Sequence, residues 1–356
     1  MSIQFMPKMG CDISMNKDLE MGLENIWKKL EYKISQGKYD GERLYQRLDL
    51  EKETGIRLAI RTSGTNRELL IQLASNDIMD FSPPQWVGMR FNVIKMDTPK
   101  KGTRHISLYL DDRIHSDVFS TVSEDIIKTL LHVDRPEHRS VKLLSCLEKW
   151  NRFFNKHGIE GLSRESQRGL YGEVFWLRRL LNGGMDTLSA IKSWQGCGKN
   201  YNDFEFVKKA VEVKTTISKE PRKIFINNER QLDDRGFNIM FLYVLTLQQT
   251  IAENKSLPVL IDDVRSQISD DITAKEHFEL KLNDAGYLEI HRPAYITGYI
   301  VKSEEIFEVK YGFPRIIDLP AGTGDISYSL TISACSSFST DIKKAIKAFM
   351  GGELDG

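Results

Sequence analysis

The most apolar run of the sequence, Ile239 to Leu247, is nine residues long. A helix that crosses a membrane needs about 20 apolar residues, so this run covers only about half of a bilayer. A short and continuous apolar run is instead typical of a buried strand. Because 40% of the residues are hydrophobic, the chain can bury a sizeable core. We therefore expect a globular protein in which this segment is a core strand.

The apolar strand closes an ordered block of predicted elements. Helical spacing is present in residues 140–156 and 163–181, and a short helix is expected near Glu229. Predicted strands occupy residues 203–207, 210–216 and 223–226. The order of helix, three strands, helix and strand predicts a mixed α/β core. Beyond it, we expect a C-terminal α+β extension with helices at 257–267 and 272–285 and strands at 294–301, 306–309 and 327–334.

The first part of the chain has a different pattern. Residues 17–34 and 118–131 have helical spacing, and between them alternating segments predict strands at 55–62, 68–73, 90–95 and 105–110. This alternation predicts a half-buried antiparallel sheet. We expect a β-rich N-terminal domain over residues 1–135 and a second domain over residues 136–356. No residue pattern indicates what the N-terminal domain does.

Composition excludes several classes of protein. Lys+Arg and Asp+Glu both number 50, so the whole chain is not a polyelectrolyte, although a local basic face remains open. The four cysteines lie far apart and form no C-x-x-C pair, which excludes a zinc ribbon and a dense disulfide scaffold. The first 15 residues lack the apolar core of a signal peptide. We expect a cytoplasmic protein that has no association with a membrane.

Three charged residues of the second domain form the main chemical signal, in the segment NDFEFVKKAVEVKTT. In a strand, alternate residues share a face, so Glu212 and Lys214 should project to one side, away from the core. A hairpin near Lys208 can bring Asp203 opposite Glu212. Glu173, in GLYGEVFWLRRLL, is a lone acid among apolar residues of the preceding helix.

Metal-dependent phosphodiester hydrolysis uses this set of side chains. Carboxylates are the hard oxygen ligands that Mg²⁺ requires. The bound ion polarises the phosphate and lowers the pKa of a water, and a neighbouring lysine can orient that water and offset charge that develops on the phosphoryl oxygens. The block from Gly161 to Arg230 holds 13 Lys and Arg against 8 Asp and Glu, which modestly favours binding to a phosphate backbone.

Asp203-x8-Glu212-x-Lys214, after a helix that carries Glu173, resembles the PD-(D/E)XK nuclease superfamily. Within it, the chain is similar to the bacterial PD-(D/E)XK-motif proteins found near restriction and phage-defence genes. The likeness also covers NNERQL at residues 227–232 and FPRIIDLPAG…ISYSLTISAC at residues 313–335. Asn202 stands where the superfamily motif has proline.

The resemblance implies a restriction-endonuclease-like core of order αβββαβ and a Mg²⁺-dependent DNA endonuclease, with Mn²⁺ as a substitute ion. Asp203 and Glu212 would be metal ligands, Glu173 an auxiliary acid at the metal, and Lys214 the catalytic lysine. Gln231 would face the site near a phosphate or a water. The implied partners are DNA, other subunits of a defence system and a second copy of the chain in a homodimer.

Several other interpretations remain open at this point. Glu212 and Lys214 could be a charge pair on a solvent-facing edge strand, and Glu173 could be a surface acid paired with Arg178 or Arg179. A chain that keeps the fold could be a catalytically inactive DNA-binding or assembly subunit. A hydrolase acting on free nucleotides would use similar chemistry.

Overall fold

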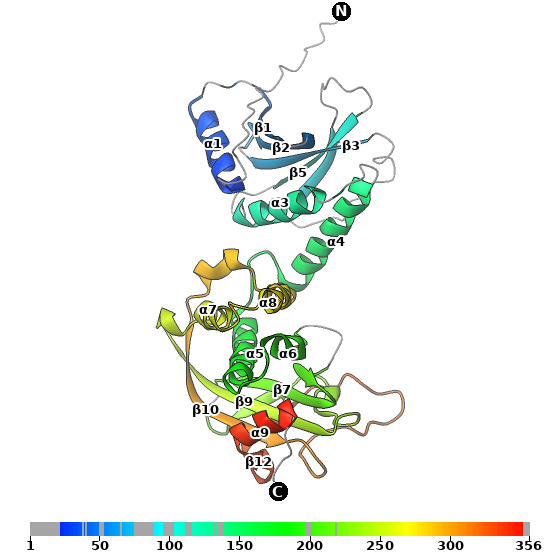
Figure 1. The fold of residues 1–356 in the computed structure, drawn as a ribbon, viewed down its shortest axis with the longest axis vertical. Helices are drawn as coiled ribbons and strands as arrows, with labels where there is room; N and C mark the ends of the chain where they lie inside the picture. Colours follow the sequence, from blue (N-terminus) through cyan, green and yellow to red (C-terminus); the bar gives the residue numbers. More distant parts are fainter. Residues whose placement is uncertain are drawn as a thin grey trace, which may run out of the picture. The chain divides into compact units, whose positions relative to one another are not determined.

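The computed structural model divides the chain into two compact units, Met1–Ile159 and Glu160–Gly356 (Figure 1). The residues that it describes are 22–37, 39, 41–49, 53–64, 66–74, 89–94, 103–110, 116–131, 133, 138–196, 201–217 and 219–351.

The division lies at Ile159, whereas the sequence suggested a boundary at residue 135. Helix α4 (Arg139–His157) belongs to the first unit because it packs on α3 (Ser116–Leu131). Trp150 of α4 donates a hydrogen bond from Nε1 to Oδ2 of Asp125 on α3, at 2.8 Å.

The first unit contains a five-stranded antiparallel sheet in the order β1-β2-β3-β5-β4. Its strands are β1 (Arg43–Asp49), β2 (Glu53–Arg61), β3 (Asn66–Ala74), β4 (Met89–Ile94) and β5 (Thr103–Leu110). The four expected strands are present, and β1 was not expected. Helix α1 (Leu23–Ser35) covers the C-terminal part of the predicted helix, whose residues 17–21 lie outside the described residues.

Helices α1 and α3 cover one face of this sheet. The rings of Trp27 on α1 and Phe119 on α3 lie 5.9 Å apart, and both side chains are fully buried. Arg67 of β3 reaches both helices, with hydrogen bonds to Glu24 and Ser120. The face of the sheet that carries Arg67 is therefore the face that the helices cover.

The second unit is built on a five-stranded sheet in the order β12-β10-β9-β7-β6. Its strands are β6 (Phe204–Phe206), β7 (Lys209–Thr216), β9 (Ile239–Thr250), β10 (Gly298–Glu308) and β12 (Ser339–Thr340). Strands β7 and β9 are parallel, and the other neighbours are antiparallel.

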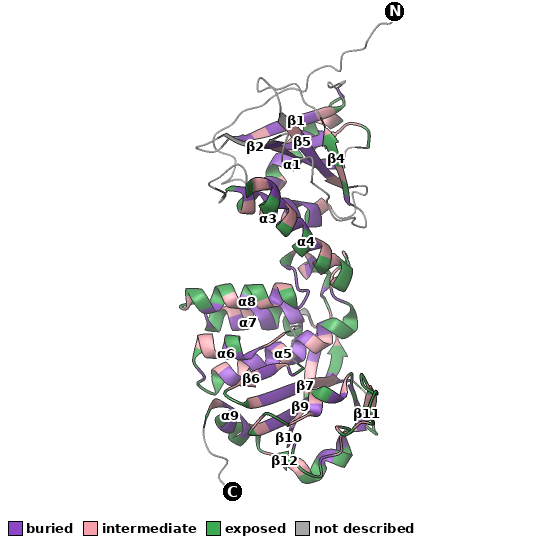
Figure 2. Cartoon of the chain, turned by 90° about the vertical axis from the view of Figure 1, so that its right-hand side faces the viewer, coloured by how far each residue is buried: buried purple, intermediate pink, exposed green. Residues whose placement is uncertain are grey.

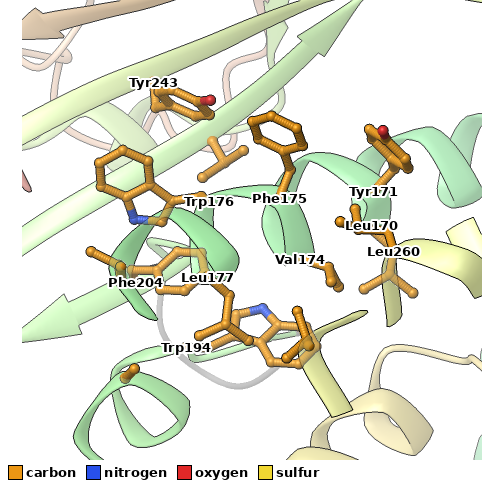
Figure 3. Close-up of a cluster of buried hydrophobic side chains, with 14 of the residues drawn as sticks. Leu170, Tyr171, Val174, Phe175, Trp176, Leu177, Trp194, Phe204, Tyr243 and Leu260 are labelled. Atoms are coloured by element: carbon orange, nitrogen blue, oxygen red, sulfur yellow. The ribbon is translucent and has the colours of Figure 1, made fainter. Parts of the chain in front are cut away.

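Helices pack on one face of this second sheet, around a large apolar cluster (Figure 3). Those next to the sheet are α5 (Arg164–Asn182), α6 (Thr187–Ser193) and α9 (Ile342–Met350). Helices α7 (Leu257–Gln267) and α8 (Ile272–Asp284) form an outer layer, in which α7 packs on α5 and α8 on α6. Ser163 caps α5 by accepting a hydrogen bond from the Ser166 amide at 3.1 Å. Phe241 and Tyr243 of β9 and Val213 of β7 face these helices.

The opposite face of the sheet is covered by a small two-stranded sheet of β8 (Lys223–Ile226) and β11 (Tyr328–Thr331). Met240, Leu242 and Val244 of β9 pack there against Ile224 and Ile226 of β8. Strand β9 is consequently buried on both faces (Figure 2), which explains its continuous apolar sequence.

Four features of this unit differ from the sequence-based expectation. Strand β8 pairs with β11 instead of joining the main sheet, and the expected second core helix is a four-residue 3₁₀ turn, η3 (Glu229–Leu232). The two strands expected at 294–301 and 306–309 are one strand, β10, with a bulge between Val301 and Ser303. Helix α9 was not expected.

Short 3₁₀ segments complete the unit: η4 (Glu253–Lys255), η5 (Glu289–Ala294) and η6 (Ile332–Phe338). Across the described part of the chain, no helix has both the length and the apolar character needed to span a bilayer. Cys146 and Cys335 are buried free thiols, whereas Cys11 and Cys197 lie outside the described residues.

Candidate active site

The hairpin between β6 and β7 positions the first two acids. Val207 and Lys208 form its turn, with φ of 44° and 57°, in the left-handed region. The strand register pairs Phe204 with Val211. Asp203 immediately precedes Phe204 and therefore lies opposite Glu212, as the sequence predicted. Its Oδ2 accepts a hydrogen bond from the Val213 amide at 2.8 Å, which anchors the carboxylate to β7.

Strand alternation places Glu212 and Lys214 on the face away from the helices. Val213, between them, packs into the helix-side core. Glu212 is fully buried, and the Lys214 side chain is 13% exposed. The Lys214 Nζ lies 2.8 Å from Glu212 Oε1. The interpretation of these residues as a solvent-facing charge pair is therefore wrong.

Gln231 connects η3 to Lys214. Its Oε1 accepts hydrogen bonds from Lys214 Nζ at 3.0 Å and from the Asn227 amide at 2.9 Å. Asn202, which is buried, donates from Nδ2 to the Gln231 carbonyl at 2.9 Å. The residue that replaces the motif proline thus ties the segment just before β6, which carries Asp203, to the turn that carries Gln231.

Glu173 enters the same region from α5. Its Oε2 accepts a hydrogen bond from Nε1 of the fully buried Trp194 at 2.7 Å. Arg178 and Arg179 pair instead with Asp263 and Glu304, so the interpretation of Glu173 as an arginine-paired surface acid is wrong.

Gly172 allows α5 to approach β7 closely. A Cβ atom at this position would lie 2.4 Å from Cγ2 of Thr215 on β7, which is far inside normal contact distance. A glycine one residue before Glu173 therefore permits the close helix–strand packing that brings this acid near the strand acids.

Burial raises the pKa of all three acids, and repulsion from Asp203 adds to this shift at Glu173 and Glu212. Burial, followed by the charge of Asp203, raises the pKa of Glu173 to about 8, although the Trp194 hydrogen bond partly opposes the shift. Burial and Asp203 also raise the pKa of Glu212 well above its usual range, and burial raises that of Asp203. Burial acts to lower the pKa of Lys214, but Glu212 and Asp203 outweigh it and raise this pKa. The ammonium is thus held charged beside three destabilised carboxylates.

The arrangement suits a hard divalent cation. Oε2 of Glu212 is buried and has no hydrogen-bond donor among the residues that the structure describes. Asp203 and Glu173 each turn one oxygen toward a protein donor. In this state, the described residues hold no set of three or more His, Cys, Asp or Glu side chains gathered closely enough to enclose a metal ion. A cation would relieve both the repulsion and the unpaired oxygen, and the donors are carboxylates, which hard cations prefer.

All five residues singled out in the sequence, Glu173, Asp203, Glu212, Lys214 and Gln231, come together in this region through hydrogen bonds or electrostatic interactions. Sequence reasoning missed the supporting groups. Trp194 is both buried and a donor to Glu173. Nothing in the sequence indicates that Asn202 donates a hydrogen bond to Gln231, apart from its position beside Asp203.

A family model described as "Putative PD-(D/E)XK family member, (DUF4420)" matches residues 23–333, which is most of the chain. A search of curated proteins and a search of solved structures found no match. Membership of this family implies a restriction-endonuclease-like fold, and the family typically uses divalent metals. On the strength of the family match over most of its length, the chain belongs to the DUF4420 family of PD-(D/E)XK proteins.

Proposed function

We propose that this protein is a Mg²⁺-dependent DNA endonuclease that hydrolyses phosphodiester bonds. The observation that carries the proposal is the buried acid group of Glu173, Asp203 and Glu212, whose pKa values are all raised, beside the charged Lys214. Strongly perturbed carboxylates that gather around one cationic side chain are characteristic of catalytic sites. Family membership supports a nuclease-like fold for the same region.

Asp203 and Glu212 would hold the divalent ion, and Glu173 would support it from α5. When bound, such an ion polarises a phosphate and lowers the pKa of a water. The protein's own contribution is to orient these carboxylates: the Val213 amide fixes Asp203, and Trp194 fixes Glu173. Glu212 retains a free oxygen within the described structure, which makes it the acid best prepared to accept a new ligand.

Lys214 would act on the attacking water and on the phosphoryl oxygens. Its Nζ is held between Glu212 Oε1 and Gln231 Oε1, so its position is fixed from two sides. Its raised pKa keeps the ammonium protonated at neutral pH, which offsets negative charge that develops on phosphate. Gln231 would then position the lysine and contact the same water or phosphate.

The resemblance to proteins encoded near restriction and phage-defence genes further suggests a role in a bacterial defence system. There, other subunits would direct the nuclease to its DNA, and a homodimer would bring two sites to the two strands. A cytoplasmic location is consistent with this role.

The test is cleavage of supercoiled and linear plasmid by the purified protein in Mg²⁺, Mn²⁺ or EDTA. Asp203→Ala and Lys214→Ala should each lower the cleavage rate by about 10²- to 10⁴-fold, because each removes a group that acts on the reacting phosphate. Lys219→Ala, at an exposed lysine outside the site, should cleave like the wild type. Cleavage that survives in both site variants would contradict the proposal.

A protein that binds Mg²⁺ but cleaves neither plasmid would be the inactive DNA-binding or assembly subunit. Isothermal titration calorimetry separates the cases: Mg²⁺ binding that disappears in Asp203→Ala places the ion at this site whether or not cleavage occurs.

A further inference from the structure

A cavity of about 420 Å³ lies on the helix side of the second sheet, between α5, the start of α7 and β10. Its apolar wall includes Tyr171 and Phe175 of α5 and Leu260 of α7 (Figure 3). Cavities that bind small molecules usually measure about 300–1,000 Å³ and combine apolar walls with a few polar groups. Among the described residues that line this cavity, none belongs to the candidate active site.

The first unpartnered group in the lining is the hydroxyl of Tyr299, on β10. The side chain is 1% exposed, and its hydroxyl has no hydrogen-bond partner among the residues that the structure describes. Its ring centre lies 4.8 Å from that of Tyr171. Burial raises the pKa of Tyr299, although Arg168 and Arg164 oppose the shift, so the hydroxyl stays protonated at neutral pH. A buried hydroxyl without a partner destabilises the protein, and a hydrogen bond to a ligand would remove this cost.

The second such group is Ser256, the N-cap residue of α7, which also lines the cavity. Ser256 is 5% exposed, and its hydroxyl neither caps the helix nor bonds any other described residue. The side chain of an N-cap serine normally accepts from the amide two or three residues further on. Pro258 has no amide hydrogen, and the Val259 amide has no acceptor in the described part of the chain. The first turn of α7 is therefore an uncapped helix end with partial positive charge.

Two cationic side chains line the cavity. Lys255 is exposed, directly precedes the N-cap residue, and has no acidic partner among the side chains that the structure describes. Arg178 lies with its guanidinium 4.6 Å from the centre of the Phe175 ring and pairs with Asp263 at 2.9 Å. Asp263 is the one acid among the described lining residues, so positive charge is in excess.

We propose that this cavity binds a nucleotide, with the phosphate at the N-terminus of α7 and the base against the aromatic wall. Helix N-termini bind phosphate because free amides and the helix dipole both favour an anion. The Ser256 hydroxyl and the Lys255 ammonium would donate to phosphate oxygens, and the Tyr299 hydroxyl would bond a polar atom of the base or sugar. Such binding is independent of cleavage at Glu212.

The experiment is isothermal titration calorimetry of the full chain with AMP, GMP, CMP and UMP in EDTA, where metal-dependent hydrolysis does not occur. We expect at least one nucleotide to bind with a dissociation constant below about 1 mM. Inorganic phosphate and the matching nucleoside should each bind at least about tenfold more weakly, because each lacks part of the contacts. Equal binding by phosphate or nucleoside alone, or a wild type that binds no nucleotide, would overturn the proposal.

Two substitutions remove the unpartnered hydroxyls with little change in packing. Tyr299→Phe and Ser256→Ala should each weaken nucleotide binding about three- to tenfold, since each deletes one hydrogen bond to the ligand. Neither should lower the melting temperature, because neither hydroxyl bonds a described residue of the protein. Lys255→Ala should weaken binding about tenfold, because it removes a charge-assisted hydrogen bond to phosphate. Unchanged affinity in all three variants would contradict the proposed site.

Tyr295→Phe is the matched control for Tyr299→Phe. The Tyr295 hydroxyl accepts a hydrogen bond from the Leu162 amide at 2.8 Å. Its loss should therefore lower the melting temperature and leave nucleotide affinity unchanged. Lys343→Ala, at an exposed lysine of α9, is the control for Lys255→Ala and should bind nucleotide like the wild type.

The proposed nuclease site is a second place at which a nucleotide could bind, and Lys214→Ala separates the two. This variant should keep full nucleotide affinity if the ligand occupies the cavity. Loss of affinity in Lys214→Ala, with affinity retained in Tyr299→Phe, would place the nucleotide at the nuclease site and overturn the proposal.

Discussion

Both units bury charged side chains beside a sheet, but they do so in opposite ways. In the first unit, Arg67 is 5% exposed and contacts Glu24 at 2.6 Å and Glu31 at 2.9 Å. In the second unit, Glu212 is fully buried near Asp203 and Glu173, with Lys214 as the cation in contact.

The pKa shifts of the acids in the two units have opposite signs. The hydrogen bond from Arg67 lowers the pKa of Glu24. Burial raises the pKa of Glu173, Asp203 and Glu212, and repulsion from Asp203 adds to the shift at Glu173 and Glu212. A buried charge that is matched by partners belongs to the framework of the fold. An excess of buried charge of one sign destabilises the protein and is retained where a ligand or reaction needs it. The contrast supports placing the proposed site at the second cluster and not at the first.

The largest effect that would test this contrast is loss of Arg67. Arg67→Ala leaves Glu24 and Glu31 without their main partner and removes packing at Trp27. Because both acids are more than a third exposed, water compensates part of the loss, and we expect a destabilisation of about 3 kcal/mol. Chemical denaturation measures it, and hydrogen exchange of the α1 and β3 amides assigns it to the first unit.

The control for this variant is Arg152→Ala, at an exposed arginine of α4, which should change stability by less than about 0.5 kcal/mol. Equal effects of the two substitutions would show that the Arg67 contacts are not part of the framework.

A second prediction concerns pH. The folded-state pKa of Glu173 is raised from 4.5 to about 8, so the folded protein retains a proton that the unfolded chain has released. Below about pH 4.5, Glu173 is protonated in both states and does not lower the free energy of unfolding of the metal-free protein. As pH rises toward 8, this free energy of unfolding falls, because only the unfolded chain releases the proton. Melting temperatures in EDTA across this range should fall with pH.

Glu173→Gln should flatten that fall, since the amide cannot ionise and can still accept the Trp194 hydrogen bond. At pH 8.5 we expect this variant to be about 2 kcal/mol more stable than the wild type. Glu276→Gln, at an exposed acid of α8, should reproduce the wild-type profile. A Glu173→Gln protein that loses stability at high pH would remove the distinction between the two clusters.

A third and smaller effect is stabilisation by metal. Mg²⁺ at about ten times its dissociation constant should raise the free energy of unfolding by about 1.4 kcal/mol. Glu212→Gln should abolish the increase, because it removes the carboxylate with an unpaired oxygen. Thermal unfolding with and without Mg²⁺ measures the difference, and an undiminished metal shift in Glu212→Gln would place the ion elsewhere.

The smallest expected effect comes from a neutral hydrogen bond in the site. Asn202→Ala removes the donor to the Gln231 carbonyl and should cost about 1 kcal/mol. Asn202→Asp would present an acceptor to that carbonyl and should be the more harmful change. Denaturation curves of the two variants decide the order, and a reversed order would show that the amide does not serve as a donor.

The sequence predicted the parts of the fold that follow a regular period. The alternation around Glu212 placed the acid and Lys214 on one face, and the apolar run at 239–247 predicted β9. Strand β8 was assigned to the wrong sheet because its partner, β11, lies about a hundred residues later and no local pattern specifies that pairing.

The contacts within the site were less accessible from sequence. Periodicity does not encode the reach of the Trp194 indole to Glu173 or of the Asn202 amide to η3, since both come from irregular segments. The division between the two units falls after α4 for a related reason: α4 has the same helical spacing as α5, and only its packing on α3 assigns it to the first unit.

The parallel alignment of β7 with β9 determines where this chain can change length during evolution. Glu212 pairs with Leu242 and Lys214 with Val244, between two apolar layers. A one-residue insertion or deletion inside β7 would turn Glu212 toward the helices and Val213 toward Gln231, because alternate residues point to opposite faces. The exposed turn at Val207 and Lys208 has no such restriction. Length variation among descendants of this sequence should therefore be found at the hairpin turn and be absent from the eight residues that follow it.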